Sequence, residues 1–213
     1  MSLFLGKIHY WLFNKILWFE GLEDEIIKLA EKENLDIKKI SDELTLKYGE
    51  KTKSKNLEEI IDQSNIHGWL QDKIHSSEGK MAAWTKFLLE NDKNNLSKLE
   101  KIYINQGIKA AVEVKSSKNL VTAKDLYTSL NDYILDGMPC DMVNEVILSQ
   151  DDLVKFKKRK CVHKEIWEKE NLDVQIFYDL RNLWIKAFIN ELNDNFEYIK
   201  ENDNVFCIRK IKN

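Results

Sequence analysis

The sequence predicts an α+β protein, in which an N-terminal helical bundle packs against a C-terminal antiparallel sheet. The chain has only seven glycines and one proline in 213 residues, which favours long helices. Gly137, Met138 and Pro139 interrupt the chain sharply, and beyond them apolar residues alternate in short runs on both sides of one helical stretch. We therefore expect a helical subdomain over residues 1–137 and an α+β subdomain over residues 138–213, integrated in one unit.

The helical part is predicted from apolar residues that recur every three or four positions. This pattern predicts helices over residues 3–33, 35–48, 57–91, 95–116 and 122–136. Thr122 is a suitable N-cap for the last of them, with Asp125 as the acidic partner of a capping box.

The C-terminal part is predicted as a hairpin, a helix and a second hairpin. The expected strands cover residues 144–149, 153–162, 196–200 and 205–211, and the amphipathic helix between the hairpins covers residues 173–192. Such a unit can curve a sheet of two hairpins over one helix and leave a hollow between them. We expect the chemistry of the protein in that hollow.

Composition excludes several classes of protein. The net charge of −3 offers no surplus of positive charge for a phosphate backbone, so we expect no nucleic-acid partner. Three cysteines, an odd number, argue against a disulfide framework and favour a cytoplasmic protein. The N-terminus also lacks the pattern of a signal peptide.

The first expected helix is strongly apolar but is not predicted to cross a membrane. Residues 3–22 are interrupted by Lys7, Lys15 and Glu20, whereas a spanning helix needs about 20 mostly apolar residues. We expect no membrane association. The helix is predicted to be buried in the protein or in a homodimer contact.

Cys161 and His163 form a Cys-x-His pair at the end of the second expected strand. Side chains two apart on a strand point to the same face, so the thiol and the imidazole would be neighbours. They are candidate catalytic residues, with Cys161 as the nucleophile and His163 as its base. The alternative is a small buried side chain beside a hydrogen-bonded histidine.

Arg181 lies within the apolar stripe of the long helix, seven residues after Val174 and three before Trp184. A guanidinium at such a position needs an acidic partner. It could hold the carboxylate of an anionic ligand, or it could form an internal ion pair. Trp184 and Trp167 are the tryptophans expected to line the hollow.

Cys207 lies on the last expected strand and could approach Cys161 if the hairpins lie side by side. Together with Cys140 and His163 these would be zinc-type ligands, but no Cys-x-x-Cys pair is present, and we expect no metal. No glycine-rich phosphate loop or dinucleotide fingerprint occurs, so we expect no cofactor. The basic run over residues 156–160 is predicted to guard an edge strand rather than to bind nucleic acid.

Residues 142–211 resemble the L-2-amino-thiazoline-4-carboxylic acid hydrolase-like family, and more distantly the four-vinyl-reductase-type sensor domains. The resemblance rests on a strand ending in "KCVH", a long helix, and a last hairpin ending in "VFCIRK", with a weaker similarity in "HSSEGKMAAWTKFL" at residues 75–88. It implies hydrolysis of a small cyclic amidine that bears a carboxylate, with Cys161 and Cys207 matching the cysteines of the family. The segment "LRNLW" departs from the family pattern, which has a further cysteine before the long helix.

The sequence therefore predicts a cytoplasmic protein that binds a small, anionic molecule, with Cys161, His163 and Arg181 converging on one pocket. A hydrolase acting on C–N bonds of a cyclic amidine is the enzymatic form of this prediction. The alternative is a non-enzymatic ligand-sensing or dimeric interaction protein.

Overall fold

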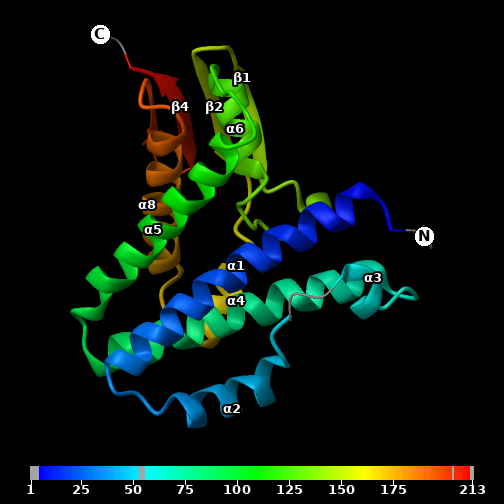
Figure 1. The fold of residues 1–213 in the computed structure, drawn as a ribbon, viewed down its shortest axis with the longest axis vertical. Helices are drawn as coiled ribbons and strands as arrows, with labels where there is room; N and C mark the ends of the chain where they lie inside the picture. The colour runs from blue at the N-terminus through cyan, green and yellow to red at the C-terminus, as the bar shows by residue number, and fades with distance from the viewer. Residues whose placement is uncertain (1–4, 53–55, 203, 212–213) are drawn as a thin grey trace. The chain divides into compact units, whose positions relative to one another are not determined.

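The computed structural model describes residues 5–52, 56–202 and 204–211, and it has the α+β fold that the sequence predicts (Figure 1). The described residues form eight α-helices, a short 3-10 helix and one four-stranded antiparallel sheet. Residues 3 and 4 of the helix expected over residues 3–33 lie outside the described residues. Within the described residues this helix is α1 (Lys7–Lys32).

The chain divides into two compact units that interleave along the sequence. The helical unit contains Met1–Leu99, Leu135–Pro139 and His163–Val174, and the sheet unit contains Glu100–Ile134, Cys140–Val162 and Gln175–Asn213. This division differs from the expected one at residue 137. Residues 100–134 group with the sheet because their helices pack on it and on its long helix.

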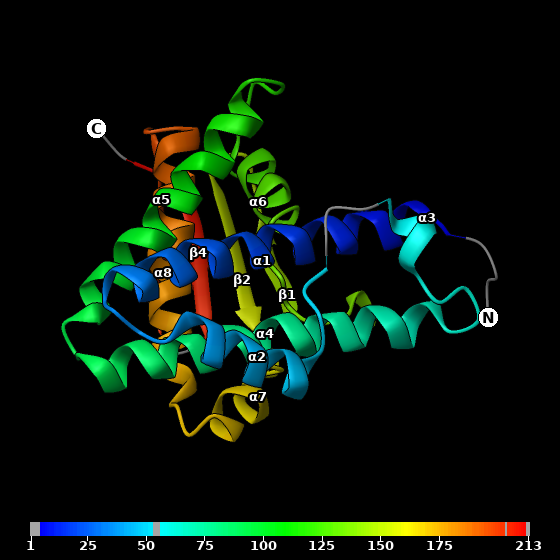
Figure 2. The ribbon, with the colours of Figure 1, turned by 60° about the horizontal axis from the view of Figure 1, so that its bottom comes forward.

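The helical unit is built on two long helices, α1 (Lys7–Lys32) and α4 (Ile66–Asn91), which lie side by side (Figures 1 and 2). The shorter helices α2 (Ile37–Tyr48) and α7 (Lys164–Lys169) both pack against α4. The apolar stripe of α1 is thus used inside this unit.

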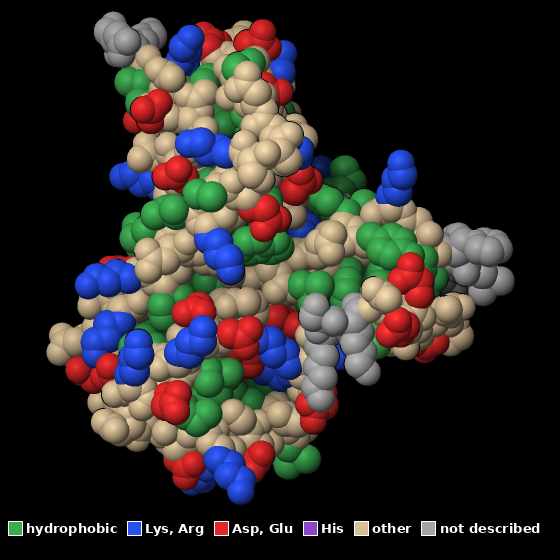
Figure 3. Space-filling view, viewed as in Figure 1, with side chains coloured by type: hydrophobic (Ala, Val, Ile, Leu, Met, Phe, Trp, Pro, Cys, Tyr) green, Lys and Arg blue, Asp and Glu red, His purple; other side chains and the backbone are tan. Residues whose placement is uncertain are grey.

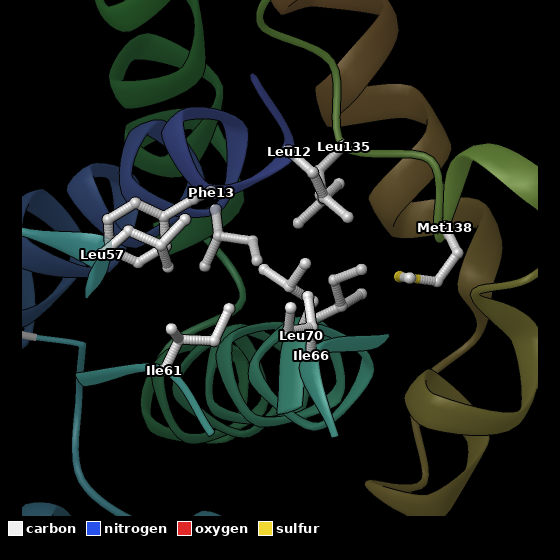
Figure 4. Close-up of a cluster of buried hydrophobic side chains, with 10 residues drawn as sticks. Leu12, Phe13, Leu57, Ile61, Ile66, Leu70, Leu135 and Met138 are labelled. Atoms are coloured by element: carbon white, nitrogen blue, oxygen red, sulfur yellow. The ribbon is translucent and has the colours of Figure 1, made fainter. Parts of the chain in front are cut away.

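Part of the core of the helical unit is a cluster of buried apolar side chains around the first halves of α1 and α4 (Figure 4). Leu12 and Phe13 come from α1, and Ile66 and Leu70 come from α4. The cluster is completed by Ile16, Leu57, Ile61, Ile74, Leu135 and Met138. The segment Leu135–Pro139 therefore contributes two of the buried side chains.

The single helix expected over residues 57–91 is two helices, α3 (Leu57–Ile60) and α4. Two polar side chains make the turn between them. Asp62 accepts hydrogen bonds from the backbone N–H and the hydroxyl of Ser64, and Asn65 caps α4 by accepting from the N–H of Gly68. Such local side-chain bonds compete with the helical ladder, which ends the first helix.

The sheet of the second unit has the strand order β1-β2-β4-β3, and all neighbouring strands are antiparallel. Its strands are β1 (Asn144–Ser149), β2 (Leu153–Lys158), β3 (Phe196–Lys200) and β4 (Val205–Lys210). Because β2 pairs with both β1 and β4, it is an inner strand. The prediction that the basic run guards an edge strand is therefore wrong.

Helices α6 (Ala123–Asn131) and α8 (Val174–Leu192) cover one face of this sheet. Helix α6 packs on β2 and β4 (Figure 1), with the ring of Tyr127 4.9 Å from that of Phe156. The predicted capping box of α6 is confirmed, since Thr122 and Asp125 each accept a hydrogen bond from the backbone N–H of the other.

Helix α5 (Asn95–Lys115) crosses α8 at close range within the sheet unit (Figures 1 and 2). A Cβ atom on Gly107 would lie 2.5 Å from the carbonyl oxygen of Trp184, closer than real Cβ contacts. Only glycine therefore permits this approach of the two backbones.

Acidic and basic side chains are interspersed on the face drawn in Figure 3. Within residues 5–52, 56–202 and 204–211, no helix combines the length and apolar character needed to cross a membrane.

Candidate functional site

The sheet unit contains a cavity of about 380 Å³ beside the first half of α8. The helix contributes Gln175, Tyr178 and Asn182, whose spacing of three and four residues places them on one face. The opposite wall comes from the end of β2 and from β3 and β4. The cavity therefore lies between the hairpins and the long helix, as the hollow predicted from the sequence does.

Positive charge dominates the described lining of this cavity. Four of its ten described residues are basic, namely Lys158, Arg159, Lys160 and Lys200, and none is acidic. Lys160 lies 2.9 Å from Asp141, and Arg159 lies 4.0 Å from Glu145. Exposed pairs of this kind are weak, so the cavity keeps a positive field.

Apart from Cys161, the rest of the described lining consists of aromatic and amide side chains. The ammonium of Lys158 lies 3.4 Å from the ring centroid of Tyr178, and Phe206 stacks with Tyr198 on the sheet below. Tyr198 also donates a hydrogen bond of 2.9 Å to the side-chain oxygen of Asn182. This bond fixes the orientation of the Asn182 amide, whose NH₂ group is a donor suited to an anion.

Cys161 lines this cavity, but it does not lie on a strand. Strand β2 ends at Lys158, four residues earlier than the strand expected over 153–162, and Cys161 follows in a loop. Its side chain is exposed, and the hydroxyl of Tyr178 donates to its sulfur at 3.0 Å. The expectation that Cys161 and His163 share a strand face is therefore not met.

His163 is buried in the helical unit, where it precedes α7. Its Nδ1 lies 2.7 Å from Oε1 of Glu78, and its Nε2 lies 3.1 Å from Oδ1 of Asp136. Burial by itself would lower the pKa of His163, but the two carboxylates outweigh it and raise the pKa to about 9. Near pH 7 the imidazole is thus protonated and engaged on both nitrogens, which leaves no lone pair for a general base.

Trp167 belongs to the same buried group as His163. Its indole N–H donates to Oε1 of Glu78 at 3.1 Å, and its side chain is completely buried. The contacts of Trp167 and His163 thus join α4, α7 and the segment Leu135–Pro139 within the helical unit.

The other predicted ligand-contacting residues lie in the sheet unit and are not among the described residues that line the cavity. Arg181 is buried, with its guanidinium 5.9 Å from the ring centroid of Phe177. Trp184 stacks on Phe188 and donates to the side-chain oxygen of Gln106 on α5.

Cys207 lies on β4 opposite Lys155 of β2 and Ile199 of β3. Since successive side chains of a strand point to opposite faces, Cys207 faces away from the side that Phe206 occupies. Its side chain is fully buried, and burial raises the pKa of its thiol.

Of the six predicted site residues, Cys161 alone is among the described residues that line the cavity. Their roles in binding or catalysis remain predictions. Sequence reasoning missed Lys158, Arg159 and Lys160 as cavity residues. The signal was the basic run itself, which continues beyond the last paired residue of β2 into a loop.

A second group of buried charged residues lies in the helical unit. Burial raises the pKa of Glu20 and of Glu23 on α1, and burial lowers the pKa of Lys80 on α4. Among the described residues, Oε2 of each glutamate has no hydrogen-bond partner. No sequence pattern indicates this group, because charged residues occur on both helices at many positions.

Among the described residues, no group of three or more His, Cys, Asp or Glu side chains is placed to hold a metal ion. Comparisons with protein-family models, with curated proteins and with solved structures find no match to this chain. The resemblance to the hydrolase-like family therefore stays a prediction from the segments that carry it.

Proposed function

We propose that this chain is a small-molecule-binding protein that holds an anionic ligand in the cavity beside α8. The observation that carries the proposal is the presence of four basic residues, and no acidic one, in the described lining. A volume of about 380 Å³ suits a small molecule, since ligand pockets have volumes of roughly 300–1,000 Å³.

The chemistry of the lining favours a ligand with a flat apolar part as well as a carboxylate. Lys158 and Lys200 would attract the carboxylate, and the Asn182 amide would donate to it. Tyr178 and Phe206 offer ring surfaces to the apolar part. The cytoplasmic location and the absence of a nucleic-acid partner remain parts of this proposal.

Hydrolysis of a carboxylate-bearing cyclic amidine is the second candidate function, and the position of Cys161 in the cavity wall favours it. In this reaction the thiolate adds to the amidine carbon, a ring C–N bond breaks, and the leaving nitrogen takes a proton. Water then cleaves the bond to sulfur and regenerates the thiol. Water or a ligand group would have to act as the base, because His163 is protonated near pH 7.

Binding of benzoate, compared with its neutral analogue benzamide, tests the anion site. Both are titrated into isotope-labelled protein and followed by the amide chemical shifts of residues around α8. We expect benzoate to bind and benzamide to bind more weakly. Loss of one charge about 5 Å from the carboxylate in Lys158→Gln should weaken benzoate about fourfold.

Lys186→Gln is the matched control, because Lys186 is exposed on the same helix and outside the described lining. It should leave the affinity for benzoate unchanged. Equal binding of benzoate and benzamide, or equal effects of the two lysine variants, would refute the anion site. Turnover of a cyclic amidine that persists in Cys161→Ala would refute the hydrolase alone.

A further inference from the structure

The thiol in the cavity wall is placed differently from the other two cysteines of the chain. Cys207 is buried in the sheet, and Cys140 is exposed in the 3-10 helix Pro139–Asp141. Cys161 is exposed and also lies among the basic lining residues. Cys140 can therefore serve as an internal control for Cys161. Both thiols are exposed, but Cys140 is not among the described lining residues of this cavity.

The sulfur of Cys161 accepts a hydrogen bond, and basic side chains that attract anions line the same cavity. The hydroxyl of Tyr178 donates to Sγ at 3.0 Å, and Lys158 lies over the ring of the same tyrosine. Lys158 and Lys160 come from the chain segment that carries Cys161, and Lys200 comes from β3. A positive cavity raises the local concentration of an anionic reagent at the sulfur.

We infer that Cys161 is a modification site that forms a mixed disulfide with small anionic disulfides. The inference rests on the proposed anion site, and it specifies the class of ligand that this site takes. The carboxylate of the reagent would lie against the basic side chains, with its S–S bond at the Cys161 sulfur.

The reaction is a thiol–disulfide exchange. The Cys161 thiol loses its proton to solvent, and its sulfur attacks one sulfur of the reagent. The S–S bond of the reagent breaks, a new bond joins Sγ to the attacked sulfur, and the other half leaves as a thiolate. The protein sulfur is oxidised and the departing sulfur is reduced, so no further oxidant is needed. An added dithiol reverses the modification.

Two aromatic disulfides of similar size and different charge test the inference. Dithiobis(nitrobenzoate) carries a carboxylate on each ring, and dithiodipyridine is uncharged near neutral pH. Their rates are measured on Cys140→Ser, which keeps Cys161, and on Cys161→Ser, which keeps Cys140. The labelled residue is identified by mass spectrometry. Cys207 contributes little in either variant, because its side chain is buried.

For each thiol we take the rate with dithiobis(nitrobenzoate) divided by the rate with dithiodipyridine. We expect this ratio to be at least about fourfold higher for Cys161 than for Cys140, because attraction by one nearby unit charge has about this effect. Adding Lys158→Gln to the Cys140→Ser chain should reduce this ratio, and so should added salt. Adding Lys186→Gln should leave the ratio unchanged. Equal ratios at the two thiols would overturn the inference.

The benzoate titration, repeated on Cys140→Ser, separates this inference from the proposed function. If benzoate binds and the rate ratios are equal, the modification site is refuted and the anion site stands. If benzoate fails to bind and the ratios are equal, both are refuted. A high ratio at Cys161 that Lys158→Gln does not reduce refutes the electrostatic selection of the reagent.

Discussion

A single buried histidine joins three segments of the helical unit. His163 precedes α7, Glu78 lies on α4, and Asp136 lies in the segment Leu135–Pro139. A charged imidazole between two carboxylates satisfies both of its N–H groups and balances part of the buried negative charge. Removal of the histidine would take away the positive charge that lies between these two carboxylates.

This arrangement predicts that the protein loses stability in mild alkali. The pKa of His163 is about 9 in the folded chain, against an ordinary value of 6.5. Because the folded chain binds this proton more tightly than the unfolded chain, protonated His163 stabilises the fold. This contribution is fully present below about pH 6.5 and is lost as the pH rises towards about 9. The loss should be on the order of 3 kcal/mol in the free energy of unfolding, measured by urea denaturation across this range.

Two histidine variants control this measurement. His163→Asn should be destabilised by about 3–5 kcal/mol near pH 6, where the buried pairs are broken, and it should lose the alkaline slope. His75→Gln should keep the slope, because His75 is exposed and contacts Gln71. An alkaline slope that survives in His163→Asn would contradict the assignment.

Single residues were the hardest part of the site to predict from the sequence. The pairing of Cys161 with His163 assumed a strand that continues to residue 162, but β2 ends at Lys158. The period of two then no longer applies, and one side chain is exposed while the other is buried. The partners Glu78 and Asp136 are 85 and 27 residues from His163 in the chain, so no local pattern could indicate them.

At the scale of secondary-structure elements, the crossing of α5 and α8 depends on one missing side chain. The backbone of α8 at Trp184 approaches Gly107 so closely that a methyl group there would meet a carbonyl oxygen. Trp184 also donates to Gln106, the neighbour of that glycine, and this bond holds the two helices in register. The close backbone contact and the hydrogen bond thus lie at the same place in the crossing of the two helices.

We predict that Gly107→Ala destabilises the sheet unit, although alanine is the better helix former. The gain in helix propensity is about 1 kcal/mol, whereas overpacking at a backbone contact costs about 1–3 kcal/mol. The midpoint of thermal or urea unfolding measures the net effect. Lys109→Ala, at an exposed position two residues on, is the control and should change stability little. A stabilised Gly107→Ala would contradict the close crossing.

Most elements could be predicted from local patterns, and the exceptions have identifiable causes. Both predicted hairpins are present, because alternation and polar turns are local signals. The helix break before Asn65 was missed because apolar residues at helical spacing lie on both sides of the polar residues 62–65. The inner position of β2 was missed because its partner β4 follows 47 residues later, counted from Lys158 to Val205.

At the scale of the whole molecule, the chain passes five times between its two units, after residues 99, 134, 139, 162 and 174. Each unit is therefore assembled from three separate stretches of sequence. The sheet unit includes α6, which packs on β2 and β4, and most of α5, which crosses α8. A cut at residue 137 would remove both helices from the sheet.

We predict that residues 138–213 do not fold by themselves. Without α6 the ring of Phe156 loses its contact with Tyr127, and without α5 the indole of Trp184 loses its bond to Gln106. The isolated fragment should show no cooperative unfolding by circular dichroism and few dispersed amide signals, whereas the full chain should show both. A fragment that unfolds cooperatively would mean that the C-terminal segment needs neither helix.

Because the two units interleave along the sequence, the order of synthesis decides when each unit can fold. As the chain leaves the ribosome, the helical unit lacks its last stretch until residue 174 has been made, and the sheet lacks its inner strand β4 until residue 210. The apolar faces of α1 and α4 can meet early, but α5 must wait for α8 and α6 must wait for β4. The sheet unit can therefore complete its folding only after β4 has been made, and until then the apolar faces that β4 will cover stay exposed on the nascent chain.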